Sequence, residues 1–357
     1  MGHDVYFLLI RIGKGGEWIG DRQEIMRLMN EYWGDHLFVF KKNGLFLRFK
    51  KIVILQRKIF NHGFLHCDDF YPNSLHRYVK SINRIYNFHC CIVNYYTYSK
   101  LLSNVDIPLK ALTTHDLFSY KNLLTGEKYV WQCTTADQEA IAMQRSPHIF
   151  ALNSEEAIFF SKLSPNSKIY NVYSVYDYKS SSIVGNRNIL FLSGNNIYNR
   201  NGLNWFLNCI FPSIKETFPD VKLIIGGGIC KLIEYLRNDP NIMVQGYIED
   251  PDAFYAQGDI VINPTYQGTG LKIKTFEAIS YDKVVLAHPH SAIGIFNPSE
   301  APIFVSKDAA EWVEYLREIW SNTIQIYNIK NTNKQYIQKM QNYILNEYNS
   351  FFDCLER

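Results

Sequence analysis

Residues 259–280 hold the side chains whose types and spacing best suit ligand chemistry. Its sequence pattern predicts a buried strand, then a loop that contains two glycines, and then a helix. In such a loop backbone N–H groups can face an anion, and the helix N-terminus and two lysines add positive charge that favours a phosphate. A glutamate further along the helix can accept hydrogen bonds from a ribose diol. The residues concerned are Gly268, Gly270, Lys272, Lys274 and Glu277.

The rest of the second half supplies a regular framework for this segment. Strand-length apolar runs alternate with helical patterns, which predicts a doubly wound α/β sheet. The predicted strands are 188–192, 221–225, 243–244, 260–263, 284–287 and 303–305, and the predicted helices are 203–218, 229–236, 251–256, 271–280 and 308–320. The first of these strands ends in a polar turn with Gly194 and Asn195. An ordinary strand-to-helix connection with a solvated lysine face is the alternative interpretation of 259–280.

The first half shows the same alternation. The predicted strands are 4–10, 36–40, 90–94, 109–113, 148–152 and 168–175, and the predicted helices are 21–30, 73–86, 127–145 and 154–163, the last capped by Ser154. His115 and Asp116 follow the fourth strand, at the carboxyl end where open parallel sheets place ligand-facing residues. A purely structural role is the alternative for His115. Gly15 and Gly16 lie in a turn after the first strand, without the spacing of a dinucleotide fingerprint.

Length and composition predict two domains. A chain of 357 residues exceeds the usual size of one hydrophobic core. Residues 178–186 lose the apolar pattern and gather Ser and Gly, which indicates a domain boundary. We expect one Rossmann-like domain over 1–180, a second over 187–330 and a C-terminal helix within 331–357.

Charge and cysteine content exclude several classes of protein. The 37 basic and 34 acidic residues give a net charge of +3, too balanced to indicate a nucleic-acid partner. Seven cysteines without a CxxC pair indicate reduced core residues of a cytoplasmic protein. No apolar run reaches the length of about 18 residues that a spanning helix needs. We therefore expect a cytoplasmic protein, either soluble or peripheral at the inner face of the membrane.

Residues 41–58 form a basic segment with apolar residues between the charges. Seven basic residues and no acidic one occur in 41–60, interleaved with Leu, Ile, Val and Phe. This composition favours an anionic membrane surface, where basic side chains add attraction and apolar ones enter the interface. A buried strand at 52–55 with basic flanks is the alternative interpretation.

Five motifs of the second half occur in a characteristic order: NILFLSGNNIYNRNGLNWF at 188–206, FPDVKL at 218–223, VQGYIED at 244–250, GDIVINP at 258–264 and GTGLKIKTFEAIS at 268–280. In order and spacing they resemble the retaining family-4 glycosyltransferases. The first half is similar more loosely, through Gly15-Gly16, His115-Asp116 and RSPHIFALNSEE at 145–156. The resemblance implies two facing Rossmann-like domains of the GT-B type, a nucleotide sugar in the cleft, and a C-terminal helix that packs back on the first domain.

The resemblance also implies roles for single residues. Glu277 corresponds to the second, ribose-binding glutamate of the family's paired-glutamate motif, and Thr269 stands where the first is usual. Lys272 and Lys274 then serve the donor diphosphate, while Arg200 is displaced from the position of the usual arginine. The implied catalytic residues are His115, Asp116 and Lys272. The implied donor-binding residues are Gly15, Gly16, Gly194, Asn195, Tyr247, Ile248, Gly268, Thr269, Gly270, Leu271, Lys272, Lys274 and Glu277.

The activity implied by the resemblance is hexosyl transfer with retention of configuration, from a UDP- or GDP-linked sugar to a glycan or lipid-linked acceptor in cell-surface polysaccharide synthesis. We expect no metal and no cofactor, because Asp68-Asp69 and the acidic segment 250–252 do not follow strands as a DxD metal site requires. The His-Cys segments 66–67 and 89–91 lack a second pair at ligand spacing. A non-catalytic nucleotide-sugar or glycan-binding protein on the same fold is the alternative.

Overall fold

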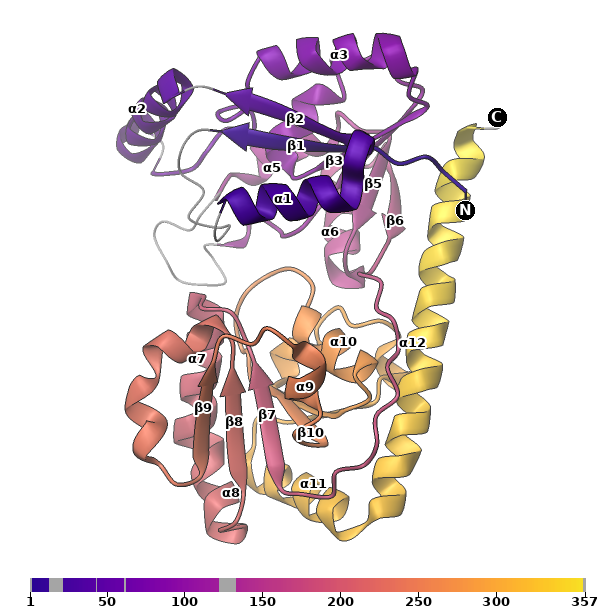
Figure 1. Ribbon diagram of the computed structural model, residues 1–357. Helices are drawn as coiled ribbons and strands as arrows, with labels where there is room; N and C mark the ends of the chain where they lie inside the picture. Colours follow the sequence, from indigo (N-terminus) through magenta and orange to yellow (C-terminus); the bar gives the residue numbers. More distant parts are fainter. Residues whose placement is uncertain (1, 13–21, 43, 61, 122–132, 356–357) are drawn as a thin grey trace.

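The computed structural model describes residues 2–12, 22–42, 44–60, 62–121 and 133–355. These residues form two α/β domains that face each other, and one long C-terminal helix runs along both of them (Figure 1). The predicted α/β class with two facing Rossmann-like domains is therefore confirmed.

The first domain is built on parallel strands. β1 pairs with β2, and β3, β4, β5 and β6 lie side by side in that order. The strands are β1 (Phe7–Ile12), β2 (Leu37–Lys42), β3 (Cys90–Asn94), β4 (Leu109–Thr113), β5 (His148–Ala151) and β6 (Lys168–Asn171), and the helices are α1 (Arg22–Trp33), α2 (Gly44–Phe60), α3 (Ser74–Tyr86), α5 (Ala136–Met143) and α6 (Ser154–Leu163). Apolar side chains on both faces of β4 and β5 are buried, as expected for strands inside a parallel sheet.

The second domain contains a six-stranded parallel sheet in the order β12-β11-β10-β7-β8-β9. Its strands are β7 (Asn188–Leu192), β8 (Lys222–Gly226), β9 (Ile242–Gly246), β10 (Ile260–Asn263), β11 (Val284–Ala287) and β12 (Ile303–Val305), and its α-helices are α7 (Ile197–Trp205), α8 (Phe211–Thr217), α9 (Pro251–Tyr255), α10 (Ile273–Ser280) and α11 (Ala309–Ser321). The strand order reverses between β7 and β10, and open sheets bind ligands beyond the carboxyl ends of the strands at this switch point. In Figure 1 the arrowheads of β7 and β8 point toward the first domain.

α12 (Thr323–Phe352) joins the two domains a second time. Its middle packs in the core beneath α10, through residues such as Ile337 and Met340. Its end reaches the first domain, where the Phe351 ring lies 4.8 Å from Phe150 and 5.7 Å from Tyr170. The carboxylate of Glu347 accepts a hydrogen bond of 2.8 Å from the backbone N–H of Asn171. The expected return of the C-terminal helix to the first domain is thus confirmed.

Two helices predicted for the second domain differ in the structure. The helix expected over 203–218 is divided by a π-helical turn, Phe206–Ile210, and Pro212 lies in the first turn of α8. Proline has no N–H to continue the preceding helical ladder, which accounts for a break at this point. The helix expected over 229–236 is replaced by two 3-10 turns, Gly228–Leu232 and Glu234–Asn238.

Two predictions for the first domain differ from the structure. Residues 52–55, considered as a buried strand, belong to α2, a helix of 17 residues. A short apolar run cannot distinguish strand from helix, and the Leu, Lys, Arg and Gln of this segment favour a helix. The cap of α6 is Asn153 rather than Ser154, because the Asn153 side chain accepts a hydrogen bond of 2.9 Å from the N–H of Glu156. Of the helix expected over 127–145, the described part runs from Ala136 to Met143.

We predict that Phe351→Ala lowers the free energy of unfolding by about 3–5 kcal/mol, because it empties a fully buried site between α12 and the first domain. Urea unfolding followed by circular dichroism measures this change. Phe60→Ala removes the same side chain from an exposed position and should change stability by less than about 0.5 kcal/mol. Equal effects of the two substitutions would contradict the proposed docking of α12.

Candidate active site

The loop between β10 and α10 lies at the switch point of the second sheet. Two of its glycines have backbone angles that side-chain-bearing residues rarely adopt, with φ of 104° at Gly268 and 79° at Gly270. A Cβ atom at Gly270 would lie 2.7 Å from the carboxylate of Asp116 and 2.9 Å from the carbonyl of His115. Any larger residue would therefore be both strained and in collision with the first domain.

Lys272 and Lys274 lie at the start of α10, where the helix dipole adds positive charge. Lys272 occupies the N-cap position and its Nζ donates to the carbonyls of Gly268 and Gly270, both at 3.3 Å. Lys274 donates at 2.6 Å to the side chain of Asn199, which comes from α7. Burial lowers the pKa of Lys272, and lowers the pKa of Lys274 to about 8. An arriving anion would stabilise the protonated form of both.

Glu277 follows Lys274 by one turn of α10, half-buried beside it. Burial raises the pKa of this carboxyl group, and the nearby charge of Lys274 lowers it in part. Because Glu277 lies within one helical turn of Lys274, a ligand whose phosphates reach Lys274 can place a hydroxyl group near Glu277.

The turns after β7, β8 and β9 come together beside this loop. Asn199 donates to the carbonyl of Gly194 at 2.9 Å and thereby links that turn to Lys274. Gly227 has φ of 94°, and its N–H donates to the carbonyl of Gly246 at 2.7 Å. The predicted residues Gly194, Asn195, Tyr247 and Ile248 therefore lie on turns at one edge of the sheet. The Tyr247 side chain is 82% exposed, which leaves its aromatic face available to a ligand.

His115 lies across from the loop, at the end of β4. Its Nε2 is 3.0 Å from the side-chain oxygen of Asn94, and its ring stacks on Tyr95 with centroids 4.2 Å apart. Burial lowers the pKa of His115, so the neutral imidazole is favoured at neutral pH. A fixed neutral ring of this kind suits a hydrogen bond to a sugar hydroxyl rather than storage of a positive charge.

Two carboxylates of the first domain contact the glycine loop directly. Asp116 accepts a hydrogen bond of 2.9 Å from the hydroxyl of Thr269, and it also pairs with Lys121 at 2.8 Å. Glu156, at the start of α6, accepts a hydrogen bond of 2.6 Å from the N–H of Gly270. The two domains are thus joined at the point where the sequence predicts the donor phosphates.

Glu156 is the residue that the sequence did not indicate. Its Oε2 atom is buried without a hydrogen-bond partner among the described residues, and burial raises its pKa to about 7. The charge of Asp116 acts in the same direction, whereas Gly270 and Lys272 favour the ionised form. The only available signal was its place in the motif at 145–156, since its partner Gly270 is 114 residues away.

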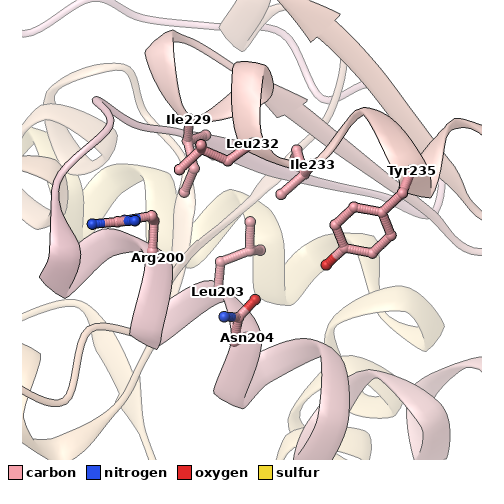
Figure 2. A pocket seen from close by; sticks show the side chains of 7 residues that line it. All are labelled: Arg200, Leu203, Asn204, Ile229, Leu232, Ile233 and Tyr235. Atoms are coloured by element: carbon pink, nitrogen blue, oxygen red, sulfur yellow. The ribbon is translucent and has the colours of Figure 1, made fainter.

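Arg200 lies on the surface of the second domain. Arg200, displaced from the usual position in the sequence, lines an open groove of about 270 Å³ on the outer side of α7 (Figure 2). The other residues that line the groove are Leu203, Asn204, Ile229, Leu232, Ile233 and Tyr235.

The acidic residues that could suggest a metal site are paired with basic side chains. Asp68 pairs with Arg145 at 2.7 Å and Asp252 with Lys179 at 2.5 Å, so both carboxylates already neutralise cations. Within the ranges that the structure describes, no three His, Cys, Asp or Glu side chains converge on one point. Gly15 and Gly16 lie outside the described residues.

Residues 186–322 match the family model described as "Glycosyl transferases group 1". The second domain is a group 1 glycosyltransferase domain. A 44.6 kDa protein from the cps region of Klebsiella pneumoniae is 26% identical to the chain in an alignment 220 residues long, with a coverage of 56% of each protein. The chain thus spans little more than half the length of this curated relative.

Solved structures support the same fold for the glycosyltransferase domain and the domain that faces it. Sucrose-phosphate synthase from Thermosynechococcus elongatus aligns over 97% of this chain and 99% of its own with a TM-score of 0.64 and 13% identity. HepE from Anabaena, solved with UDP, aligns over 97% and 100% with a TM-score of 0.60 and 13% identity. TarM aligns over 74% of this chain and 54% of its own with a TM-score of 0.56 and 12% identity. The GT-B fold is therefore confirmed, and the match of residues 186–322 confirms the expected group 1 glycosyltransferase domain.

We predict that Glu156→Gln strengthens binding of a nucleoside diphosphate at high pH. Glu156 is mostly protonated below its pKa of about 7 and ionised above it, so rising pH places a negative charge beside the glycosyltransferase loop. Wild-type affinity should then fall relative to that of the variant, by at most about tenfold per pH unit above 7. Calorimetric titration with UDP at pH 6–9 measures the ratio.

Both proteins are titrated at the same pH, so protonation of the nucleotide affects both affinities equally and cancels in their ratio. Glu155→Gln, on the exposed neighbour, serves as the control and should follow the wild type. A ratio between the Glu156→Gln variant and the wild type that stays constant from pH 6 to pH 9 would show that the Glu156 carboxylate does not face the phosphates.

Proposed function

We propose that the protein transfers a sugar from a UDP-linked donor to a glycan or lipid-linked acceptor, with retention of configuration. The observation that carries the proposal is the grouping of Gly270, Lys272, Lys274 and Glu277 at the switch point of the second domain, facing the first. A nucleoside diphosphate offers a matching set of groups, because its phosphates suit the lysines and its ribose diol suits Glu277.

The choice of donor draws on the solved neighbours. HepE was solved with UDP and with UDP-glucose, and these two structures cover nearly the whole of this chain. A UDP-sugar is therefore the donor we propose in preference to a GDP-sugar. The relative from the cps region of Klebsiella pneumoniae supports a role in polysaccharide synthesis.

The proposed reaction breaks the bond between the anomeric carbon and the departing diphosphate oxygen and forms a bond from that carbon to the acceptor hydroxyl oxygen. Negative charge grows on the diphosphate, and Lys272, Lys274 and the start of α10 lie where they stabilise it. Attack from the face that the diphosphate leaves gives retention. On that face the departing oxygen can take the proton of the acceptor hydroxyl. Because lysine charges stabilise the leaving group, we propose a reaction without a metal or cofactor.

The first domain contributes the groups around the transferred sugar in this proposal. Its His115 and Asp116 lie at the carboxyl end of β4, and the Asp116 side chain reaches Thr269. The neutral imidazole of His115 can bind a sugar hydroxyl, while Asp116 holds the loop against the first domain. The acceptor then approaches from the side of the first domain and reaches the anomeric carbon on the face that the diphosphate leaves.

We predict that Lys274→Ala weakens UDP binding by about 1.5–3 kcal/mol, or roughly 10- to 150-fold, the range for loss of a charge-assisted hydrogen bond. Isothermal titration calorimetry measures the affinity. Lys307→Ala removes an exposed lysine of the same domain and should leave the affinity unchanged. If both variants bind UDP as the wild type does, the phosphate-binding role of Lys274 is wrong.

We predict that Glu277→Gln reduces turnover of UDP-sugars at least about tenfold, because the amide offers a weaker acceptor to the ribose diol than the carboxylate. Release of UDP from a panel of UDP- and GDP-sugars, with and without lipid-linked acceptors, measures turnover. Folding of the variant is checked by its thermal unfolding midpoint. A wild-type protein that binds UDP and turns over no donor in the panel would favour a non-catalytic binding protein.

A further inference from the structure

We propose that α2 is an interfacial helix that docks the first domain on an anionic lipid surface. Five large apolar side chains of this helix are more than half exposed: Phe49 by 60%, Ile52 by 55%, Leu55 by 59%, Ile59 by 64% and Phe60 by 83%. At 100° per residue they fall within one arc of about 140°. The exposed apolar side chains thus share one side of the helix, where the exposed Gln56 is a polar residue among them.

This face has no packing role in the described structure. None of the α2 side chains that the structure describes is buried, and none of them belongs to the first-domain core. Among these described side chains, Val53, Ile54 and Arg57 are partly covered. An apolar face of this kind marks a contact with another surface rather than a part of the core.

One ion pair fixes the orientation of the helix. Arg57 donates two hydrogen bonds of 2.9 Å to the carboxylate of Asp69, which also accepts from the N–H of His66 at 2.8 Å. Arg57 therefore holds α2 to the domain, and its charge is already matched. The apolar arc lies on the side away from this anchor, and Figure 1 shows α2 at the edge of the first domain, distant from α12.

The positive charge around the apolar side chains of α2 favours an anionic lipid surface as their binding partner. The segment 41–60 contains seven basic residues and no acidic one, and Lys41 and Lys51 are exposed. On the helical wheel Lys51 lies next to the apolar arc, beside Leu55. Apolar side chains with lysine at the flank are typical of helices that lie in the headgroup region of anionic membranes. The inference stands on this surface alone and does not depend on the proposed reaction.

The test is sedimentation of the full chain with vesicles of phosphatidylglycerol and phosphatidylcholine. We expect binding that falls as salt rises from about 0.1 to 0.5 M, because the Debye length shortens. The double variant Ile52→Ser/Ile59→Ser should lower the partition coefficient at least about tenfold, since each apolar side chain that enters the interface contributes separately. Lys51→Glu should also weaken binding and should make its dependence on phosphatidylglycerol content less steep, because one attractive charge is replaced by a repulsive one.

Matched controls come from exposed positions on α3 and α6. Ile85→Ser/Ile158→Ser alters two side chains that are 77% and 62% exposed, and Lys80→Glu reverses an exposed charge on α3. Both controls should bind as the wild type does. The proposal is overturned if the wild type ignores the vesicles, if it binds pure phosphatidylcholine equally well, or if the α2 variants bind unchanged. Light scattering that shows the α2 variants dissolving a dimer would instead make the face a contact between two copies, and would also overturn it.

Discussion

The contact between the glycine loop of the second domain and the carboxylates of the first constrains the rest of the site. Gly270 is in van der Waals contact with the segment at His115 and Asp116, and its N–H is bound to Glu156. Only a residue without a side chain, in a left-handed conformation, allows the two domains to approach this closely. The same conformation turns the loop so that α10 begins at the interface. Lys272 and Lys274, at the start of α10, therefore lie at the interface as well. Domain arrangement and anion site therefore depend on one short loop.

The charges at this interface are balanced across the two domains. Burial lowers the pKa of Lys272, while Glu156 and Asp116 raise it, so the protonated lysine is held by carboxylates of the opposite domain. Buried charges without partners cost several kcal/mol each, so these groups stabilise one another when the domains are together. A diphosphate between them adds negative charge that favours protonated Lys272 and Lys274 and protonated Glu156. Donor binding is therefore coupled to proton uptake by these groups, which lie at the domain interface.

The sequence predicted most strands and the location of the site, and it failed where local patterns are ambiguous or partners are distant. The strands at 90–94, 109–113 and 260–263 are apolar runs that match the structure residue for residue, since buried parallel strands leave a strong local signal. The segment 52–55 was ambiguous because a short apolar run suits both a strand and a helix, and the exposed face of α2 resembles a core segment in sequence. Glu156 was missed because a single glutamate at the start of a helix usually faces solvent, and its partner lies in the other domain. The pairing of Arg57 with Asp69 could not be predicted from the basic segment, because Asp69 lies outside that segment, 12 residues along the chain.

The most direct test of the central claim is a crystal structure of the protein with UDP bound. We expect the diphosphate within hydrogen-bonding distance of Lys274 and the start of α10, with the ribose hydroxyls on Glu277 and the uracil beside the turn at Tyr247 and Ile248. The carboxylate of Glu156 should have moved away from the phosphates or have become protonated beside them. A nucleotide bound in the groove at Arg200, or anywhere that leaves Lys274 and Glu277 without contact to it, would contradict the assignment of this loop as the donor site.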